Sequence, residues 1–166
     1  MKTIILSVPA VEPVTLDEVK DQLRIDNTVD DDYLNALISA ARNRCEDYCN
    51  QFFTIRDIAL VTTANLITEL PYPNLTITSV EVDDIVVTGF TYDSDTQILT
   101  LDNSGGKLKI YATTAAPIEL SGIQQSIKII VTDLYETRTE SVLGVSVSEN
   151  LALKAMLYPY RLSLSI

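Results

Sequence analysis

This sequence of 166 residues contains no histidine and no tryptophan, only two cysteines, and 12 basic against 23 acidic side chains. Without histidine, Ser-His-Asp and Cys-His nucleophile systems and histidine metal sites are excluded. The net charge of −11 argues against a surface that wraps nucleic acid, because such a surface needs Lys and Arg to displace counterions. No apolar run is long enough to span a bilayer, and the short apolar stretch after Met1 is broken at Pro9. We therefore expect neither a membrane span nor a signal peptide.

What the sequence does contain is typical of a globular domain, with 46% hydrophobic and 21% charged residues. The length predicts a single domain, residues 1–166, that can bury its own core. Cys45 and Cys49 lie four residues apart, a spacing that on a helix suits a disulfide poorly. Two thiols without further ligands make no zinc site, so we expect small buried side chains.

The N-terminal part predicts an extended arm followed by two helices. Proline at positions 9 and 13 excludes a helix over residues 1–14. Thr15 and Glu18 form a capping box, which predicts a short helix ending near Arg24 and Ile25. A second helix is predicted after the acidic residues 30–32, which suit the positive end of a helix dipole.

The second helix has the apolar periodicity of an amphipathic helix. Its apolar stripe consists of Leu34, Leu37, Ile38, Ala41, Cys45 and Tyr48. The opposite face, expected to be exposed, carries Asn35, Ser39, Arg42, Asn43, Glu46 and Asp47.

Residues 55–113 change to a period of two, with many threonines and turn residues, which predicts a small antiparallel β insertion. Strands are expected around 58–62, 75–82, 85–87, 90–92, 98–101 and 108–111. Turns are expected at 83–84, 93–95 and 103–106.

A third helix is predicted from Pro117 to about Arg138, with a strand at 127–132 as the alternative. After a polar loop over 140–147, Ser148 is expected to cap a final helix through Leu157, which Pro159 stops. The predicted fold is therefore α+β and mainly helical: a bundle of about four helices with the β insertion between helices 2 and 3. An apolar tail, residues 160–166, follows the last helix.

No motif supports catalysis or cofactor binding. The acids at 26–32 lack the spacing and the glycine of a calcium loop, and we interpret them as helix caps. Ser104–Lys107 has neither the spacing of a phosphate-binding loop nor a helix after it. We expect no catalytic residue, no metal and no cofactor.

Several strings, taken in order, resemble the head–tail connector (adaptor) proteins of tailed bacteriophages. Residues 16–24 resemble the family's Leu-x-Glu-x-Lys-x-x-Leu-Arg helix, which an acidic stretch and a longer helix follow. The other matching strings are Ala40-Ala41-Arg42 with Glu46 and Tyr48, Leu70-Pro71-Tyr72-Pro73, Leu134-Tyr135-Glu136-Thr137-Arg138, and Leu157-Tyr158-Pro159-Tyr160-Arg161. The sequence departs from the family at Leu134, where an aromatic residue is common, and after Tyr111, where a glycine is usual.

The resemblance implies a non-enzymatic virion protein of a phage or prophage. Such proteins form a ring, usually of twelve copies, that docks under the portal protein, extends the DNA channel and receives the head-closure or tail proteins. It would act at the head–tail interface after assembly in the host cytoplasm, with no membrane partner and no specific DNA binding.

Candidate contacts with other subunits or partners follow from side-chain chemistry. Arg138 and Arg161 suit ion pairs between subunits, although exposed arginines at helix ends are an equal interpretation. The tail, with Tyr160, Leu162, Leu164 and Ile166, would otherwise expose apolar side chains, so it either binds a neighbour or packs back on its own subunit.

Two alternatives remain. A tail-terminator or head-closure protein would be dominated by β structure. An acidic DNA mimic that inhibits a host nucleic-acid-binding protein would need its acids on one face. Residues 1–57, 58–116 and 117–166 carry net charges of −5, −5 and −1, an even spread that disfavours the mimic. In a ring, the same acidity would repel DNA phosphates and let the genome slide.

Overall fold

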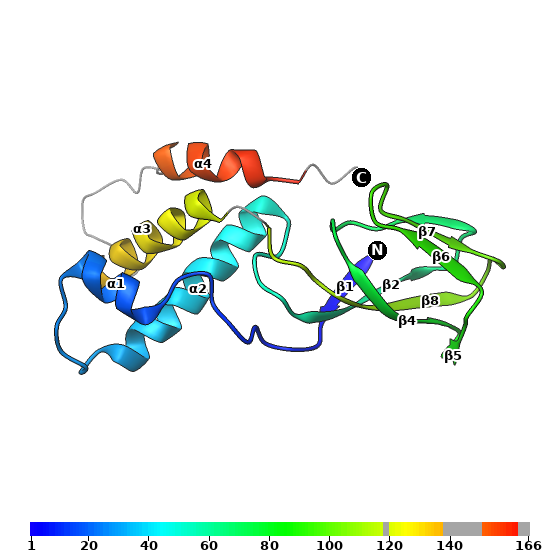
Figure 1. Cartoon of the computed structure of the whole chain (residues 1–166), viewed down its shortest axis with the longest axis horizontal. Helices are drawn as coiled ribbons and strands as arrows, with labels where there is room; N and C mark the ends of the chain where they lie inside the picture. Colours follow the sequence, from blue (N-terminus) through cyan, green and yellow to red (C-terminus); the bar gives the residue numbers. More distant parts are fainter. Residues whose placement is uncertain (118–119, 138–150, 163–166) are drawn as a thin grey trace. The chain divides into compact units, whose positions relative to one another are not determined.

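The computed structural model describes residues 1–117, 120–137 and 151–162. The chain divides into two compact units (Figure 1). Met1–Val11 and Thr54–Ala116 form the β unit, and Glu12–Phe53 with Pro117–Ile166 form the helical unit. The β region between the second and third helices confirms the predicted α+β class.

The helical unit contains α1 (Leu16–Leu23), α2 (Asp31–Cys49), α3 (Ser121–Thr137) and α4 (Leu151–Leu157), followed by a 3₁₀ turn, η1 (Tyr158–Tyr160). The capping box at α1 is confirmed: Thr15 N donates to Glu18 Oε2 at 2.8 Å, and Glu18 N donates to Thr15 Oγ1 at 3.2 Å. Arg24 ends the helix in the left-handed conformation. Two orphan N–H groups are thereby satisfied at the start of a helix of only 8 residues.

The predicted apolar stripes of α2 and α3 form the core of the helical unit. Fully buried side chains of α2 face those of α3, and Val14, Val19, Phe53 and Leu157 complete the cluster. Residues 127–132 lie in α3, so the helix predicted from the apolar periodicity is confirmed and the alternative strand is wrong, despite the β propensity of Ile and Val. The start at Pro117 is wrong, because Thr114 is still bonded to the carbonyl oxygens of Thr54 and Arg56 and the helix begins only at Ser121. The predicted loop at 140–147 and the cap at Ser148 lie outside the described residues.

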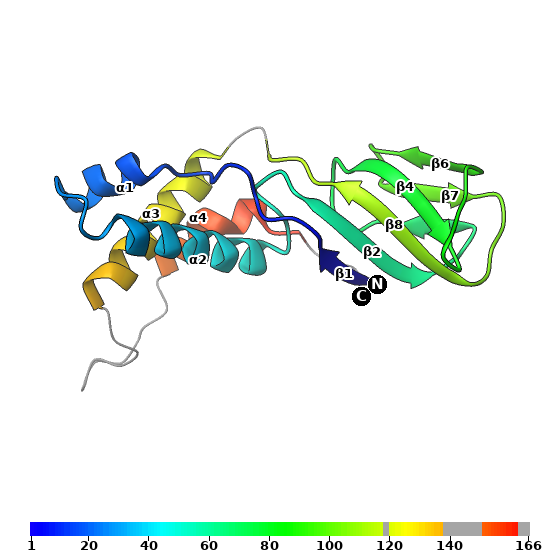
Figure 2. The same ribbon diagram turned by 90° about the horizontal axis from the view of Figure 1, so that it is seen from below.

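The β unit holds two antiparallel sheets (Figure 2). The larger has the order β1-β2-β8-β4-β5, with β1 (Lys2–Ile5), β2 (Asp57–Thr63), β8 (Lys107–Thr113), β4 (Thr76–Val82) and β5 (Ile85–Val86). The smaller has the order β3-β7-β6, with β3 (Ile67–Glu69), β7 (Ile98–Leu101) and β6 (Phe90–Asp93).

Two strands were not predicted. Residues 2–5, expected as part of an extended arm, pair with β2 as an edge strand, and β3 forms where no strand was expected. Both are short edge strands, whose pairing partners lie about thirty residues or more away in sequence. Local sequence patterns carry little information about such long-range pairing.

The predicted hairpin turn at residues 83–84 is confirmed between β4 and β5. Asp83 and Asp84 both have positive φ, 51° and 64°, as a two-residue turn of the mirror-image type requires. Asp83 Oδ1 also accepts a hydrogen bond of 2.7 Å from Lys107 N, which ties the turn to β8. Among the residues that the structure describes, no helix has both the length and the apolarity to cross a membrane.

Candidate functional site

The described part of the C-terminal segment, Tyr160–Leu162, packs on the end of α2 in its own unit. Leu162 N donates to Cys49 O at 2.8 Å, and Asn50 Nδ2 donates to Leu162 O at 3.3 Å. Gln51 Nε2 donates to the carbonyl oxygen of Tyr160. The structure thus shows the self-packing alternative for Tyr160 and Leu162, because their backbone groups are hydrogen-bonded to Cys49, Asn50 and Gln51.

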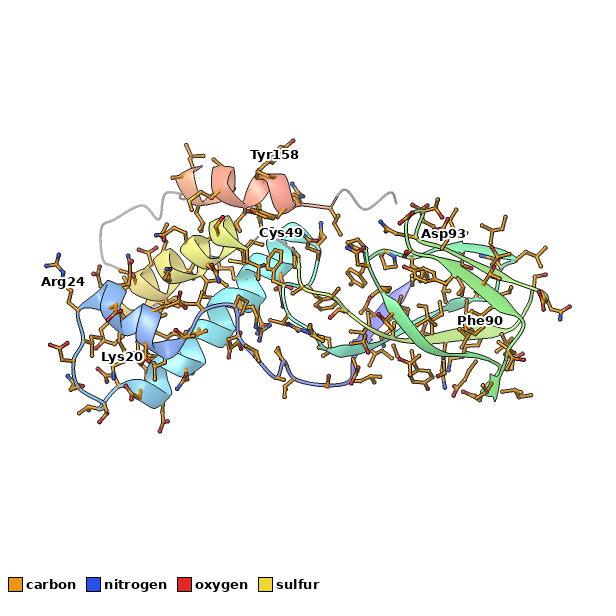
Figure 3. All side chains as sticks on the ribbon, viewed as in Figure 1. Lys20, Arg24, Cys49, Phe90, Asp93 and Tyr158 are labelled. Carbon is orange, nitrogen blue, oxygen red and sulfur yellow. The ribbon has the colours of Figure 1, made fainter. Side chains whose placement is uncertain are left out.

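The side chains of this segment differ in how closely they pack on the helical unit. The ring of Tyr160 packs edge-on against Phe53, with centroids 6.5 Å apart. The guanidinium carbon of Arg161 lies 5.5 Å from the centroid of the Tyr48 ring, a cation–π contact, and the residue is exposed. Tyr158 projects from the same end of the unit and is exposed (Figure 3). Arg138, Leu164 and Ile166, the other predicted contacts, lie outside the described residues.

A buried ion network crosses the face of α2 that was predicted to be exposed. Arg42 is only 4% exposed; its Nε donates to Glu12 Oε2 at 2.7 Å and its Nη1 to Glu46 Oε2 at 2.8 Å. Glu46 Oε1 in turn accepts from Phe53 N at 2.9 Å, and Glu12 Oε1 accepts from Ser39 Oγ at 2.9 Å. The expected exposure of Arg42 and Glu46 is therefore wrong.

The physical reason for this burial is mutual satisfaction of charge. Burial alone lowers the pKa of Arg42, but the hydrogen bonds and charges of Glu12 and Glu46 outweigh it and raise the pKa above its usual value. A buried guanidinium with two carboxylates is stable where an unpaired one is not. The i, i+4 spacing of Arg42 and Glu46 was the available signal, since it places both on one side of a helix.

The two cysteines of α2 are free and buried, as predicted. Burial raises the pKa of the Cys45 thiol to about 12 and that of Cys49 to about 11. Cys49 Sγ also lies 3.6 Å from the carbonyl oxygen of Leu157, next to α4 (Figure 3). Thiols in this state are poor nucleophiles, because the thiolate is the reactive form.

Two of the acidic residues at 26–32, Asp30 and Asp31, have structural partners within the helical unit. Asp30 does not cap α2 with its side chain, contrary to our interpretation of this cluster; its carboxylate accepts from Tyr135 Oη at 2.5 Å. Lys20 Nζ pairs with Asp31 Oδ1 at 2.8 Å; Lys20 is labelled on α1 in Figure 3. Within residues 1–117, 120–137 and 151–162, no three acidic or thiol side chains come together in a way that could hold a metal ion.

Several exposed aliphatic side chains lie on edge strands of the β unit. They are Ile4 and Ile5 on β1, Ile67 on β3, and Ile85 and Val86 on β5. The sequence patterns gave no indication of this, because an edge position is a property of the sheet order. Edge strands of monomeric proteins are usually protected by Lys, Pro or irregular geometry, so these edges are candidates for assembly.

Comparison with known families identifies the type of protein. Residues 13–79 match the family described as phage gp6-like head-tail connector protein. Over these residues, which include α1, α2, β2, β3 and part of β4, the chain is similar to this connector family. The predicted resemblance is thereby confirmed. The family so described is one of structural, non-enzymatic proteins, as the resemblance implied.

Solved structures share the fold of the whole chain. It matches a chain in the neck of an empty GTA particle, computed with C6 symmetry, at a TM-score of 0.75 and 17% identity. It matches a chain in the neck of the native GTA particle, computed with C12 symmetry, at 0.75 and 16%. A chain in the virion of the native gene transfer agent (GTA) particle gives 0.72 and 17%. Each match covers 100% of this chain and 98% of the other. No curated protein matches the sequence.

Proposed function

We propose that this connector is one subunit of a ring in the virion neck, at the head–tail interface, where it joins the capsid to the tail and extends the DNA channel. The observation that carries the proposal is the match of residues 13–79 to the gp6-like connector family. The likeness of the entire chain to neck chains of particles computed with C6 and C12 symmetry supports a ring, and twelve copies agree with both.

The proposed partners are the portal protein on the head side and a head-closure or tail protein on the other. Assembly would take place in the host cytoplasm. Arg161 is exposed at the C-terminal end of the helical unit, so it remains our candidate for an ion pair with a neighbour. Arg138, Tyr160, Leu162, Leu164 and Ile166 remain proposed contacts with a subunit or the portal.

The net charge of −11 suits a channel that DNA passes without binding. Like charge on the channel wall repels phosphates, and few basic groups are present to hold them. A ring structure whose bore is lined by Lys and Arg would contradict this part of the proposal.

The alternatives have less support. Described α-helices of 8, 19, 17 and 7 residues exceed a fifth of the chain, which disfavours a β-dominated tail terminator. A DNA mimic needs unpaired acids on one face, whereas Asp31, Asp84, Glu12 and Glu46 are each paired with a base.

Electron microscopy and native mass spectrometry of the purified protein, alone and with its cognate portal protein, test the proposal. A closed ring of defined stoichiometry in complex with the portal is expected. A protein that stays monomeric under both conditions contradicts it. Capture of a host nuclease or polymerase in place of the portal would favour the DNA mimic.

A further inference from the structure

The five-stranded sheet ends on both sides in strands that carry exposed aliphatic residues. Ile5 on β1 is 56% exposed and Ile85 on β5 is 68% exposed. The strand pairings place both side chains on the sheet face that also carries the fully buried Leu60, Leu108 and Ile110. Each isoleucine therefore belongs to the core-facing side and is exposed because the sheet stops there.

The backbone at these two edges has unpaired groups that face outward. In an antiparallel ladder, residues alternate between those bonded to the neighbouring strand and those directed away from it. Leu6 N donates to Asp57 O at 2.9 Å, so the backbone N–H and C=O groups of Ile4 also point toward β2. Those of Thr3 and Ile5 therefore point outward, away from the sheet. Val87 N donates to Val80 O at 2.9 Å, so Val86 faces outward from β5. In the described ranges, no further strand pairs with the outer edge of either.

The two edges fit each other in one register. All neighbours in the sheet are antiparallel, so the first and fifth strands, β1 and β5, run in the same direction. A β5 placed beside the β1 of a second copy with the same orientation would pair in parallel. With Val86 opposite Ile4, Ile5 N–H reaches the carbonyl of Val86, and Val86 N–H reaches the carbonyl of Thr3.

The same register satisfies the side chains. The pairings Lys2–Val61, Val61–Lys109, Lys109–Glu81 and Glu81–Val86 place Lys2, Ile4 and Val86 on one face of the sheet. Ile4 then lies beside Val86 on that face. The backbone hydrogen-bonding groups and the apolar side chains thus fit in the same register.

We propose that β5 of one copy adds in parallel to β1 of the next copy, so that the large sheet continues from subunit to subunit around the ring. This inference rests on the ring proposed above and names the surface that holds it together. A contact between two different edges is heterologous and can repeat around a closed ring, whereas a β1–β1 contact is isologous and stops at two copies.

Cysteine cross-linking tests the register in rings of the full chain, assembled with the portal protein where the wild type requires it. We expect the double variant Ile4→Cys/Val86→Cys, treated with a short bis-maleimide, to give a ladder of covalent oligomers up to the full ring. Each single variant should stay monomeric on a denaturing gel. The native Cys45 and Cys49 need not be replaced in these variants, because both are buried.

A proline pair tests the backbone contribution. Ile5→Pro removes an outward N–H without removing a β1–β2 hydrogen bond, and it should lower the ring fraction in native mass spectrometry at least tenfold. The matched control is Ile67→Pro, since Leu101 N donates to Leu66 O and Ile67, 65% exposed, therefore faces outward from β3. This control should assemble like the wild type, and both monomers should keep the wild-type circular dichroism spectrum.

The outcomes separate this inference from the proposed function. Rings in the microscope without a cross-linked ladder, or with Ile5→Pro assembling normally, overturn the β5–β1 contact and leave the connector ring standing. Covalent dimers from Ile4→Cys alone overturn it in favour of a β1–β1 contact. If the wild type forms no ring with or without the portal, the proposed function fails and the inference fails with it.

Discussion

The two units of this protein depart from the usual division of polar and apolar residues in opposite ways. The helical unit buries a charged group, Arg42, which finds its partners Glu12 and Glu46 within the same unit. The β unit exposes aliphatic residues at its sheet edges, and in the described structure these edges find no partner strand. The buried ion pairs of Arg42 bear on the stability of a single chain. The exposed aliphatic residues on the edge strands bear on the assembly that we propose.

The largest expected effect comes from breaking the ion network. Arg42→Ala leaves two carboxylates without their cation and should lower the free energy of unfolding of the helical unit by about 3–5 kcal/mol. Urea denaturation followed by circular dichroism at the helix band measures this. Arg44→Ala is the control, because Arg44 lies two residues further along α2 and is exposed. Its free energy of unfolding should stay within about 0.5 kcal/mol of the wild-type value. Equal effects at the two positions would mean that the buried network does not stabilise the unit.

The buried thiols predict a pH dependence confined to the helical unit. Their pKa values are raised, to about 12 for Cys45 and about 11 for Cys49, so the unfolded chain loses these protons at lower pH than the folded chain. Stability must then fall as the pH rises above the ordinary thiol value of about 9. Between pH 8 and pH 10 we expect the two thiols together to cost roughly 2–3 kcal/mol of stability.

Urea denaturation at several pH values measures this loss, and Cys45→Ala/Cys49→Ala is the control. The double variant lacks both thiols and should show a flatter pH dependence in the same range. If its slope equals that of the wild type, other groups cause the alkaline loss of stability.

A turn of the β unit should show a smaller effect. Gly106 has φ 88°, and a Cβ there would come within 2.4 Å of Asp83 Oδ2. Gly105 also has positive φ, 102°, but an added Cβ there would lie in open space. Gly106→Ala should therefore lower the free energy of unfolding by about 1 kcal/mol more than Gly105→Ala does. Thermal unfolding of the two variants compares them. Equal costs would show that Asp83 moves away freely and that only the backbone conformation matters.

The smallest effect on subunit stability is expected at the sheet edge. Ile85→Val removes one methylene from a side chain that is 68% exposed, and the unassembled protein should unfold within about 0.3 kcal/mol of wild type. Ile110→Val in the middle of the same sheet, where the side chain is fully buried, should cost about 1 kcal/mol. Denaturation of monomeric protein checks both. A cost at Ile85 as large as at Ile110 would show that the edge is already covered within the subunit.

Much of the fold could be predicted because its signals are local. The capping box at Thr15, the apolar stripe from Leu34 to Cys45 and the stripe from Ile123 to Val131 each specify a helix within a few turns. The β strands from 76 to 113 alternate in the same local way. The family strings also appear in the predicted order, and the first of them lie within the matched residues 13–79.

The candidate site was predictable only in part. Tyr160 and Leu162 are held at the end of α2 by hydrogen bonds to Cys49, Asn50 and Gln51, residues that are more than 100 positions away. The burial of Arg42 depends on Glu12 in the same way, 30 positions before it. Such contacts depend on which segments meet in space, which periodicity does not encode.

By itself, the sequence determined the approximate positions of the described helices, the capping box of α1, the acidic charge and the resemblance to the connector family, because each depends on residues that are neighbours along the chain. The tertiary structure alone decided that residues 2–5 close one edge of a sheet, that Ile85 and Val86 close the other, and that Arg42 is buried. Edges and burial follow from the order of strands and the meeting of distant segments. Hydrogen bonding across a sheet joins residues whose separation in sequence is unrestricted, so no local pattern fixes which strand is last.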